Sequence, residues 1–172
     1  ILLVKHGTEL GVAPLTRCDL TAFLSMDDGA TWSAPEEITA SEMPHSWNWY
    51  ATGPGHGIQL ESGRLLIPCD HREPDMPNRT SRSHVICSDD HGATWKLGGI
   101  LDLDTNECEA VECPAEGTVY MNMRSFHGRK RRACARSAGS GEGRALSLVL
   151  RLHGLRSLRR GGEFVKDAGP HT

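Results

Sequence analysis

Apolar and polar positions alternate in short stretches along most of the chain. In "DLTAFLS", residues 19–25, Leu20, Ala22 and Leu24 occupy every second position, which is the period of a half-buried β-strand. In "GIQLESGRLLIPCD", residues 57–70, two apolar runs flank Glu-Ser-Gly, which predicts a hairpin with Gly63 in its turn. No convincing apolar stripe with a helical period appears before residue 140. Short strands joined by Gly-containing turns predict an all-β fold, either a sandwich, a barrel or a propeller.

One eight-residue motif occurs twice, as "SMDDGATW" at residues 25–32 and "SDDHGATW" at residues 88–95. Its Asp can offer a carboxylate to nearby backbone N–H groups, and Gly29 or Gly92 can adopt the positive φ of a tight turn. The paired acidic residues raise the alternative of a calcium loop, but the ligand ladder and closing Glu of an EF-type loop are absent. We therefore expect a structural turn, with the closing residues Trp32 and Trp95 buried in equivalent places.

Composition and charge narrow the class of protein. The chain has 172 residues, about one domain, and a net charge of −3, which gives no bulk reason to expect nucleic acid as a partner. The basic cluster "RKRRACAR", residues 129–136, crosses a predicted hairpin without aromatic stacking residues, so we expect solvated charges and no nucleic acid. No apolar run approaches the roughly 18 residues of a membrane span. The chain starts without Met and shows no signal-peptide pattern, so we expect either a cytosolic compartment or a true N-terminus that this sequence lacks, and the compartment stays open.

The six cysteines, Cys18, Cys69, Cys87, Cys108, Cys113 and Cys134, show no C-x-x-C spacing. We expect free thiols in preference to disulfides, and zinc only as a distant third possibility. The sequence gives no reason to expect a metal or a cofactor.

The repeated motif has the form S-x-D-x-G-x-T-W, which resembles the Asp box of sialidases and related β-propellers. Two longer stretches resemble the middle of exo-α-sialidases in their residues and in their order along the chain. They are "WYATGPGHGIQLESGRLLIPCDH" at residues 49–71 and "TNECEAVECPAEGTVYMNMRS" at residues 105–125. The resemblance runs from about residue 16 to residue 136. It implies an all-β fold, a partial six-bladed β-propeller of about two to three four-stranded antiparallel blades with Asp-box hairpins. We expect residues 1–136 to form this partial propeller.

Residues 137–172 depart from the family pattern. A third box should follow "RACARS", but the sequence there turns to Leu, Arg and Gly. We interpret 137–172 as a non-matching tail, disordered or forming a short helix, whose coding frame could be shifted.

The resemblance also implies a reaction, the retaining hydrolysis of terminal sialic acid from glycoconjugates without a cofactor. Sialidases use a Tyr nucleophile in place of a carboxylate, and a Glu in a T-x-E-C context, here Glu107, serves as its base. The substrate carboxylate is held by three arginines, of which the one in an N-x-R-S strand falls on Arg124. Asp70 and His71 fall where the family contacts the outer hydroxyls of the sugar. The expected partner is a sialylated glycan, and the oligomeric state stays open.

Each of these residues also has an ordinary structural interpretation. Glu107 could be a solvated strand residue, and Arg124 could pair with a surface acid. Strand alternation nevertheless sets Arg124 on a polar face with Tyr120 and Asn122, as a strand lining a wet channel requires. His56 in "GPGHG" is interpreted as structural.

Parts of the sialidase machinery are not recognisable in the chain. Neither tyrosine, Tyr50 or Tyr120, stands in the context of the family's nucleophile, and the acid Asp and the other two arginines are not found. We therefore expect this chain to be inactive alone. The alternative is a non-catalytic Asp-box propeller that binds glycans or protein.

Glu107 and Arg124 should lie on adjacent strands with their charged ends roughly 4 to 8 Å apart, at the end of the sheet opposite the Asp-box turns. Asp70 and His71 should line the same open pocket.

Overall fold

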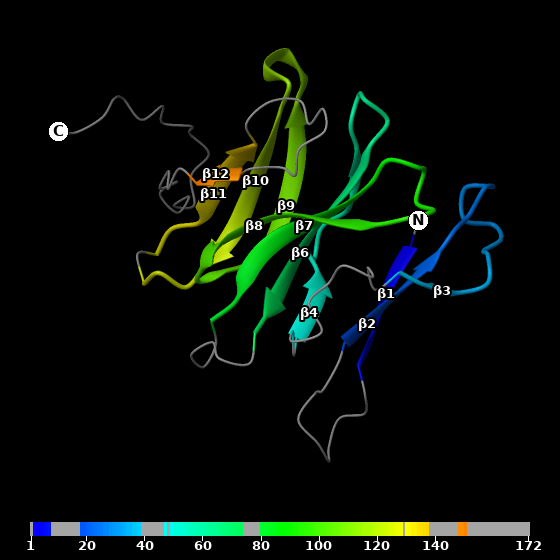
Figure 1. The fold of residues 1–172 in the computed structure, drawn as a ribbon, viewed down its shortest axis with the longest axis horizontal. Coiled ribbons are helices and arrows are strands. Elements are labelled where there is room, and N and C mark those ends of the chain that lie inside the picture. The colour runs from blue at the N-terminus through cyan, green and yellow to red at the C-terminus, as the bar shows by residue number, and fades with distance from the viewer. Residues whose placement is uncertain are drawn as a thin grey trace, which may run out of the picture.

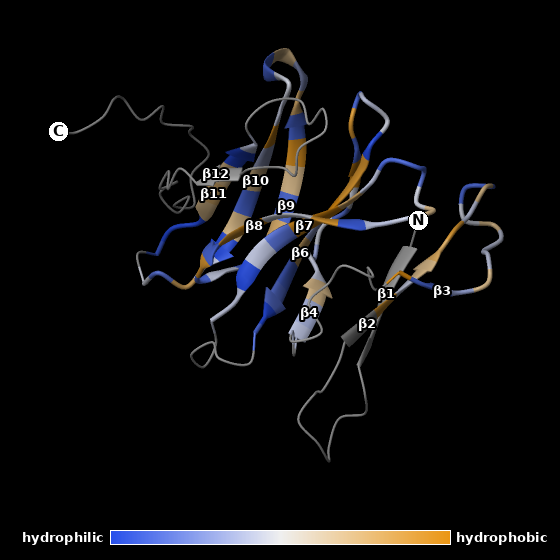
Figure 2. Cartoon of the chain, in the orientation of Figure 1, coloured by the Kyte–Doolittle hydropathy of each residue, from blue (hydrophilic) through white to orange (hydrophobic). Residues whose placement is uncertain are grey.

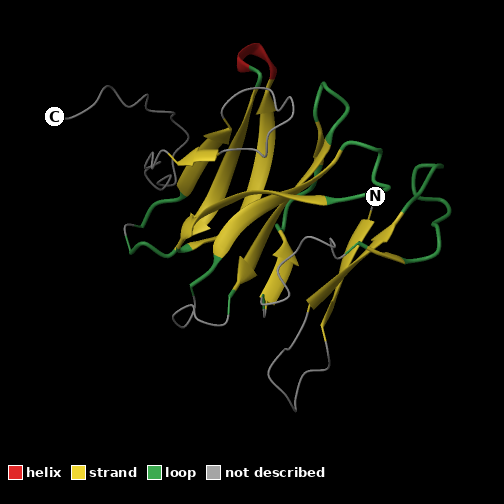
Figure 3. Cartoon of the chain, in the orientation of Figure 1, coloured by secondary structure: helices red, strands yellow, loops and turns green. Residues whose placement is uncertain are grey.

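The computed structural model describes residues 2–7, 18–38, 47, 49–73, 80–128, 130–137 and 148–150. In this part of the chain the regular elements are β-strands and one 3₁₀ turn, Pro114–Glu116 (Figure 3). The all-β class predicted from the sequence is confirmed. None of the described elements is a helix long and apolar enough to cross a membrane.

The strands form three antiparallel sheets that follow one another along the chain (Figure 1). The first sheet has the order β1-β2-β3, with β1 at Leu2–Gly7, β2 at Cys18–Phe23 and β3 at Glu36–Glu37. The second has the order β4-β6-β7-β8, with β4 at Trp49–Thr52, β6 at Leu65–Arg72, β7 at Arg82–Ser88 and β8 at Lys96–Leu103. A short strand, β5 at Ile58–Gln59, also pairs with β6. The third has the order β12-β11-β10-β9, with β9 at Thr105–Cys113, β10 at Thr118–Ser125, β11 at Ala133–Ser137 and β12 at Leu148–Leu150.

The inner strands of the second sheet, β6 and β7, are buried on both faces, whereas its edge strand β8 is largely exposed. β6 and β7 are buried along almost their whole length, without the one-sided alternation of a surface strand. One core cluster joins the first and second sheets and contains Leu20, Ala22, Ile38, Trp47, Tyr50, Ile67, Cys69, Ile86 and Trp95. The other joins the second and third sheets and contains Leu60, Leu66, Val85, Leu101, Cys108, Ala110, Val119, Met121, Met123, Ala133 and Ala135.

Local sequence patterns match these elements closely. The alternating segment 19–25 overlaps β2, and the turn before β6 has Gly63 at φ 89°, as the hairpin prediction requires. In β10, Val119, Met121 and Met123 are buried while Arg124 is exposed. Figure 2 shows this mixture of polar and apolar positions along the strands of the third sheet.

The sheets are open within the described residues, so the number of blades and the closed six-bladed ring stay predictions. Leu148–Leu150, in the segment interpreted as a tail, is a strand paired with β11 and not part of a helix. Most of the segment 137–172 lies outside the described residues, and the boundary after residue 136 stays a prediction.

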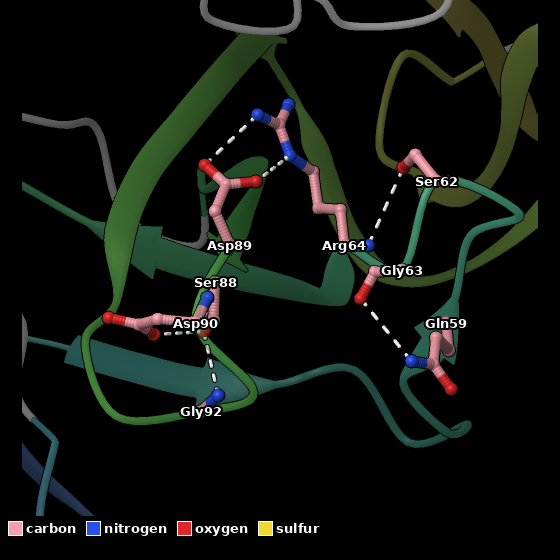
Figure 4. Close-up of polar contacts among 8 residues, drawn as sticks. All are labelled: Gln59, Ser62, Gly63, Arg64, Ser88, Asp89, Asp90 and Gly92. Atoms are coloured by element: carbon pink, nitrogen blue, oxygen red, sulfur yellow. Dashed lines mark hydrogen bonds and ion pairs between the residues drawn. The ribbon is translucent and has the colours of Figure 1, made fainter.

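Both eight-residue repeats form the same hydrogen-bonded turn. In the second copy the hydroxyl oxygen of Ser88 accepts a hydrogen bond from the Gly92 amide (2.8 Å), and Asp90 accepts from the amide and the hydroxyl of Thr94 (2.8 and 2.5 Å), as Figure 4 shows in part. These bonds, above all the Thr94 hydroxyl, lower the pKa of Asp90 to about 2. The first copy repeats the same bonds with Ser25, Asp27, Gly29 and Thr31.

The two closing tryptophans differ, and the expectation of equivalent burial is wrong for the first. Trp95 is 7% exposed and joins the core, whereas Trp32 is 47% exposed. Trp32 does lie against the glycine of its turn, because a Cβ atom added at Gly29 would be 3.5 Å from the indole ring. The partly buried Leu65 and Leu97 pack against the core cluster that contains Trp95. Trp32, beside the short edge strand β3, belongs to neither core cluster.

Candidate functional site

The predicted site residues lie at the end of the sheets away from the Asp-box turns. In the antiparallel pairing of β6 with β7, Ser88 of the second box faces Leu65, and at the other end Arg82 faces His71. Asp70 and His71 therefore occupy the end of the second sheet opposite the box. Glu107 follows the turn from β8 into β9, and Arg124 is near the end of β10.

Glu107 and Arg124 form an ion pair across adjacent strands. The Arg124 Nη1 donates to Glu107 Oε2 at 3.2 Å, and both side chains are about half exposed, at 50% and 49%. The guanidinium carbon also lies 4.9 Å from the centre of the Phe126 ring, a cation–π geometry. The predicted placement on adjacent strands is confirmed, and the charged ends are slightly closer than predicted.

A β-bulge brings these two side chains together. In the register of β9 with β10, Met123 faces Cys108 and Ser125 faces Thr105, so two residues of β9, Asn106 and Glu107, oppose Arg124 alone. Such a bulge breaks the alternation of a strand and redirects a side chain. Thr105 and Asn106 are accordingly both buried, and Glu107 is exposed on the face of Arg124.

Asp70 is buried and does not face open solvent. It is 3% exposed, and its Oδ2 accepts a hydrogen bond from Asn106 Nδ2 at 2.9 Å and a longer one from Trp49 Nε1 at 3.4 Å. Asn106 therefore links Asp70 to the residue next to Glu107.

His71 lies on the opposite face of β6 from Asp70, because adjacent residues of a strand point in opposite directions. Its ring is fully buried, stacks on Trp47 with the ring centres 3.6 Å apart, and has its Nδ1 2.9 Å from that of His84. Burial lowers the pKa of His71 to about 3, and burial with the neighbouring His71 lowers the pKa of His84 well below its ordinary value. The expectation of one open pocket shared by Asp70 and His71 is wrong in this structure, and their contact with substrate stays a prediction.

The pKa values of both tyrosines are raised above the ordinary phenol value. Burial raises the pKa of Tyr50, whose hydroxyl donates to Cys69 Sγ at 3.0 Å. Burial and a hydrogen bond to Cys134 raise the pKa of Tyr120 to about 12. Neither phenol forms a described contact with Glu107.

Other candidate residues have structural partners. His56 Nδ1 lies 3.3 Å from Glu109 Oε1, while Gly53 approaches β9 so closely that a Cβ there would lie 2.1 Å from the Cys108 carbonyl oxygen. In the basic cluster, Arg132 donates to Asn122 and Arg136 pairs with Glu116. The cysteines whose side chains are described, Cys69, Cys87, Cys108, Cys113 and Cys134, are free thiols. No group of three or more potential metal ligands occurs among the described residues.

The residues that sequence reasoning missed are Asn106, Trp47 and His84. Asn106 stands directly before Glu107, but its role depends on partners on β6 and near β7 that no local pattern indicates. His84 and Trp47 become visible only through their packing on His71.

The comparisons with known proteins find a family model and several sialidases. Residues 2–154 match the BNR repeat-like domain family. Sialidase-2 of Cricetulus griseus is 33% identical over 143 residues, which cover 78% of this chain and 37% of that protein. Sialidase-4 of Homo sapiens is 35% identical over 135 residues, covering 70% of this chain and 28% of that protein. The chain thus spans well under half the length of these curated relatives.

Solved structures agree with the sequence comparison. The Hadza microbial sialidase Hz136 superposes with a TM-score of 0.66 at 31% identity, over 83% of this chain and 26% of that one. The NanB sialidase from Streptococcus pneumoniae gives a TM-score of 0.58 at 20% identity, over 78% of this chain and 19% of that one, a likeness of fold. With its two Asp-box turns and these relatives, the chain belongs to the BNR-repeat sialidase family.

Proposed function

We propose that Glu107 and Arg124 are part of an exo-α-sialidase site, at which terminal sialic acid is removed from glycoconjugates by retaining hydrolysis. The observation that carries this proposal is their ion pair, half exposed and at the end of the sheets opposite the Asp-box turns. Membership of the sialidase family supports it further.

In this proposal Arg124 binds the carboxylate of sialic acid. A guanidinium presents several N–H donors in one plane, which matches the two oxygens of a carboxylate. The side chain is half exposed, so a ligand can reach it from solvent. Glu107 and the ring of Phe126 hold the guanidinium in place before substrate arrives.

Glu107 would act as the base for a tyrosine nucleophile. An ordinary phenol has a pKa near ~10 and attacks poorly unless a neighbouring carboxylate accepts its proton. A neutral phenol also avoids repulsion from the carboxylate of sialic acid, which lies beside the carbon that is attacked. As Glu107 accepts the phenol proton, the tyrosine oxygen forms a bond to that carbon, the glycosidic C–O bond breaks, and the acid Asp protonates the leaving oxygen. Water then displaces the tyrosine from the same carbon, which completes hydrolysis with retention.

The nucleophile itself is not Tyr50 or Tyr120 in this proposal. Both pKa values are raised by burial, and both hydroxyls are bonded to cysteine sulfur. The attacking tyrosine, the acid Asp and two further arginines would come from blades beyond those described. We therefore propose that the chain by itself does not hydrolyse sialosides, while the complete propeller does.

A chimera tests this proposal. Residues 18–137 of this chain would replace the corresponding stretch of Sialidase-2 from Cricetulus griseus, and hydrolysis of a fluorogenic sialoside would be measured. We expect activity in the chimera and a loss of roughly 10²-fold or more in kcat for Glu107→Gln, the size of a general-base contribution. Glu109→Gln, on the same exposed face of β9, is the matched control. A folded but inactive chimera, or equal losses for the two variants, would favour the non-catalytic glycan-binding alternative.

A further inference from the structure

A polar cluster lies buried between the second and third sheets, directly behind Glu107. It consists of the side chains of Asp70, Ser81, Ser83, Thr105 and Asn106, each no more than 7% exposed. A hydrophobic cluster that includes Leu66, Val85 and Met121 fills space between the same two sheets. Buried polar groups are costly unless their hydrogen bonds are made, so the arrangement of this cluster is constrained.

Asn106 is at the centre of the cluster. Its Nδ2 donates to Asp70 Oδ2 and to Ser81 Oγ, both at 2.9 Å. Ser81 Oγ in turn donates to the carbonyl oxygen of Thr105 at 2.8 Å. The amide side chain thereby joins the beginning of β9 to the end of β6 and to the residue before β7.

The backbone of the bulge is held as well. Ser83 Oγ donates to the carbonyl oxygen of Asn106 at 2.6 Å, and the Ser83 amide donates to Thr105 Oγ1 at 2.9 Å. These bonds bind both Thr105 and Asn106 to β7, on the inner side of β9. With both residues turned inward, the next residue, Glu107, faces outward toward Arg124.

We propose that Asn106 is a positioning residue, which Asp70 and Ser83 hold so that the bulge presents Glu107 to Arg124. The importance of this alignment for catalysis rests on the sialidase function proposed above. Asp70 then acts behind the site, through Asn106. An amide at position 106 suits this role because it donates to a carboxylate and a hydroxyl at once.

The alignment can be tested on this chain without any substrate. In the uniformly ¹⁵N-labelled chain, the side-chain N–H signals of Arg124 report its bond to Glu107, and Glu107→Gln identifies the signature of the broken pair. The amide signals of Gly92 and Thr94, at the distant Asp box, report whether the chain is folded. We expect Asn106→Leu to shift Arg124 to the broken-pair signature, whereas Asn122→Leu on β10 leaves the signature in place.

A reciprocal exchange provides the rescue. In Asp70→Asn with Asn106→Asp, one amide and one carboxylate still face each other with the roles exchanged, and the Ser81 hydroxyl can rotate to donate. We expect the double variant to recover the Arg124 signature that Asn106→Asp alone loses, because two carboxylates 2.9 Å apart would repel.

An unchanged Arg124 signature in folded Asn106→Leu would overturn the proposal. If Asn106→Leu loses the Asp-box signals, the chain is unfolded and the double variant Asp70→Asn with Asn106→Asp decides. Recovery of the Arg124 signature in the double variant supports the positioning role of Asn106, and failure to recover it overturns that role. A chimera without sialidase activity, together with loss and rescue of the signature, would refute the proposed function but not the positioning role.

Discussion

The two ends of the second sheet are built in different ways. At the Asp-box end the turn is closed by hydrogen bonds between residues four positions apart, such as Thr94 to Asp90, and the same set recurs in the first box. At the opposite end the bonds join distant residues, with Asn106 and Asp70 separated by 36 positions and Arg124 and Glu107 by 17. The turn of the Asp box is therefore formed by its own eight residues and recurs wherever they recur. The candidate site forms only when the three strands β6, β9 and β10 are correctly placed.

The largest expected effect is the loss of stability when the tryptophan of an Asp box is replaced. It tests whether the two boxes differ in long-range packing and not in the local turn. Trp95→Ala should lower the free energy of unfolding by about 3–5 kcal/mol because it opens a cavity in the core. Trp32→Ala should cost less than about 1 kcal/mol because its indole is half exposed. Denaturant unfolding followed by circular dichroism measures both. Equal losses would contradict the claim that the two tryptophans differ in how they are packed.

A smaller effect is expected at the site end, where the buried polar cluster holds the bulge. Ser83→Ala removes a donor to the Asn106 carbonyl and should cost about 1–3 kcal/mol, since a buried acceptor loses its partner. Ser62→Ala, in the exposed turn before β6, is the control and should change stability by about 0.5 kcal/mol or less. The same denaturant experiment measures both variants, and equal stabilities would contradict the claim that the buried polar cluster holds the bulge.

Acid should destabilise the site end before the box end. The folded pKa of His71 is about 3 and that of His84 is also lowered, against an ordinary value near ~6.5. The unfolded chain therefore binds more protons, and stability falls as pH drops from about 6.5 toward 3. Arg82 disfavours the charged form of His71, and Glu73 Oε1, 3.5 Å from His71 Nε2, favours it. In a pH series of unfolding curves, His71→Gln with His84→Gln should flatten this decline, and an unchanged slope would contradict it.

The smallest effect concerns the box end at still lower pH. Hydrogen bonds from Thr94 and Ser88 lower the pKa of Asp90 to about 2, so its contribution is present above about 4 and lost as pH falls toward 2. Asp27 should behave in the same way, because its pKa is also lowered, chiefly by Thr31. Titration of both carboxyl groups by NMR measures this directly. Ordinary values for both would show that the box bonds do not form in solution.

The sequence predicted the features that depend on near neighbours. The box turns follow from residues within four positions, and the approach of Glu107 to Arg124 follows from two strands joined by a tight turn at Gly117, which has φ 60°. The sequence alone would also have allowed the prediction that Asp70 and His71 point to opposite faces of the sheet, because adjacent residues of a strand alternate. The burial of Trp95 but not Trp32 could not be predicted, because neighbouring sheets decide it. The role of Asn106 depends on Asp70 and Ser83, which lie far away in the sequence.

The most direct test of the central claim asks whether Arg124 recognises a carboxylate. In the chimera with Cricetulus griseus Sialidase-2, kcat/KM would be compared for a sialoside and for its methyl ester, which lacks the negative charge. A charge-assisted bond of about 1.5–3 kcal/mol predicts that Arg124→Gln lowers kcat/KM roughly 10- to 100-fold for the acid and leaves the ester within about twofold. Arg136→Gln, which removes the pair with Glu116 and the contact with the Tyr120 ring, should change neither. Equal losses for acid and ester, or an equal effect of Arg136→Gln, would contradict the assignment of this end of the sheets as part of a sialic acid site.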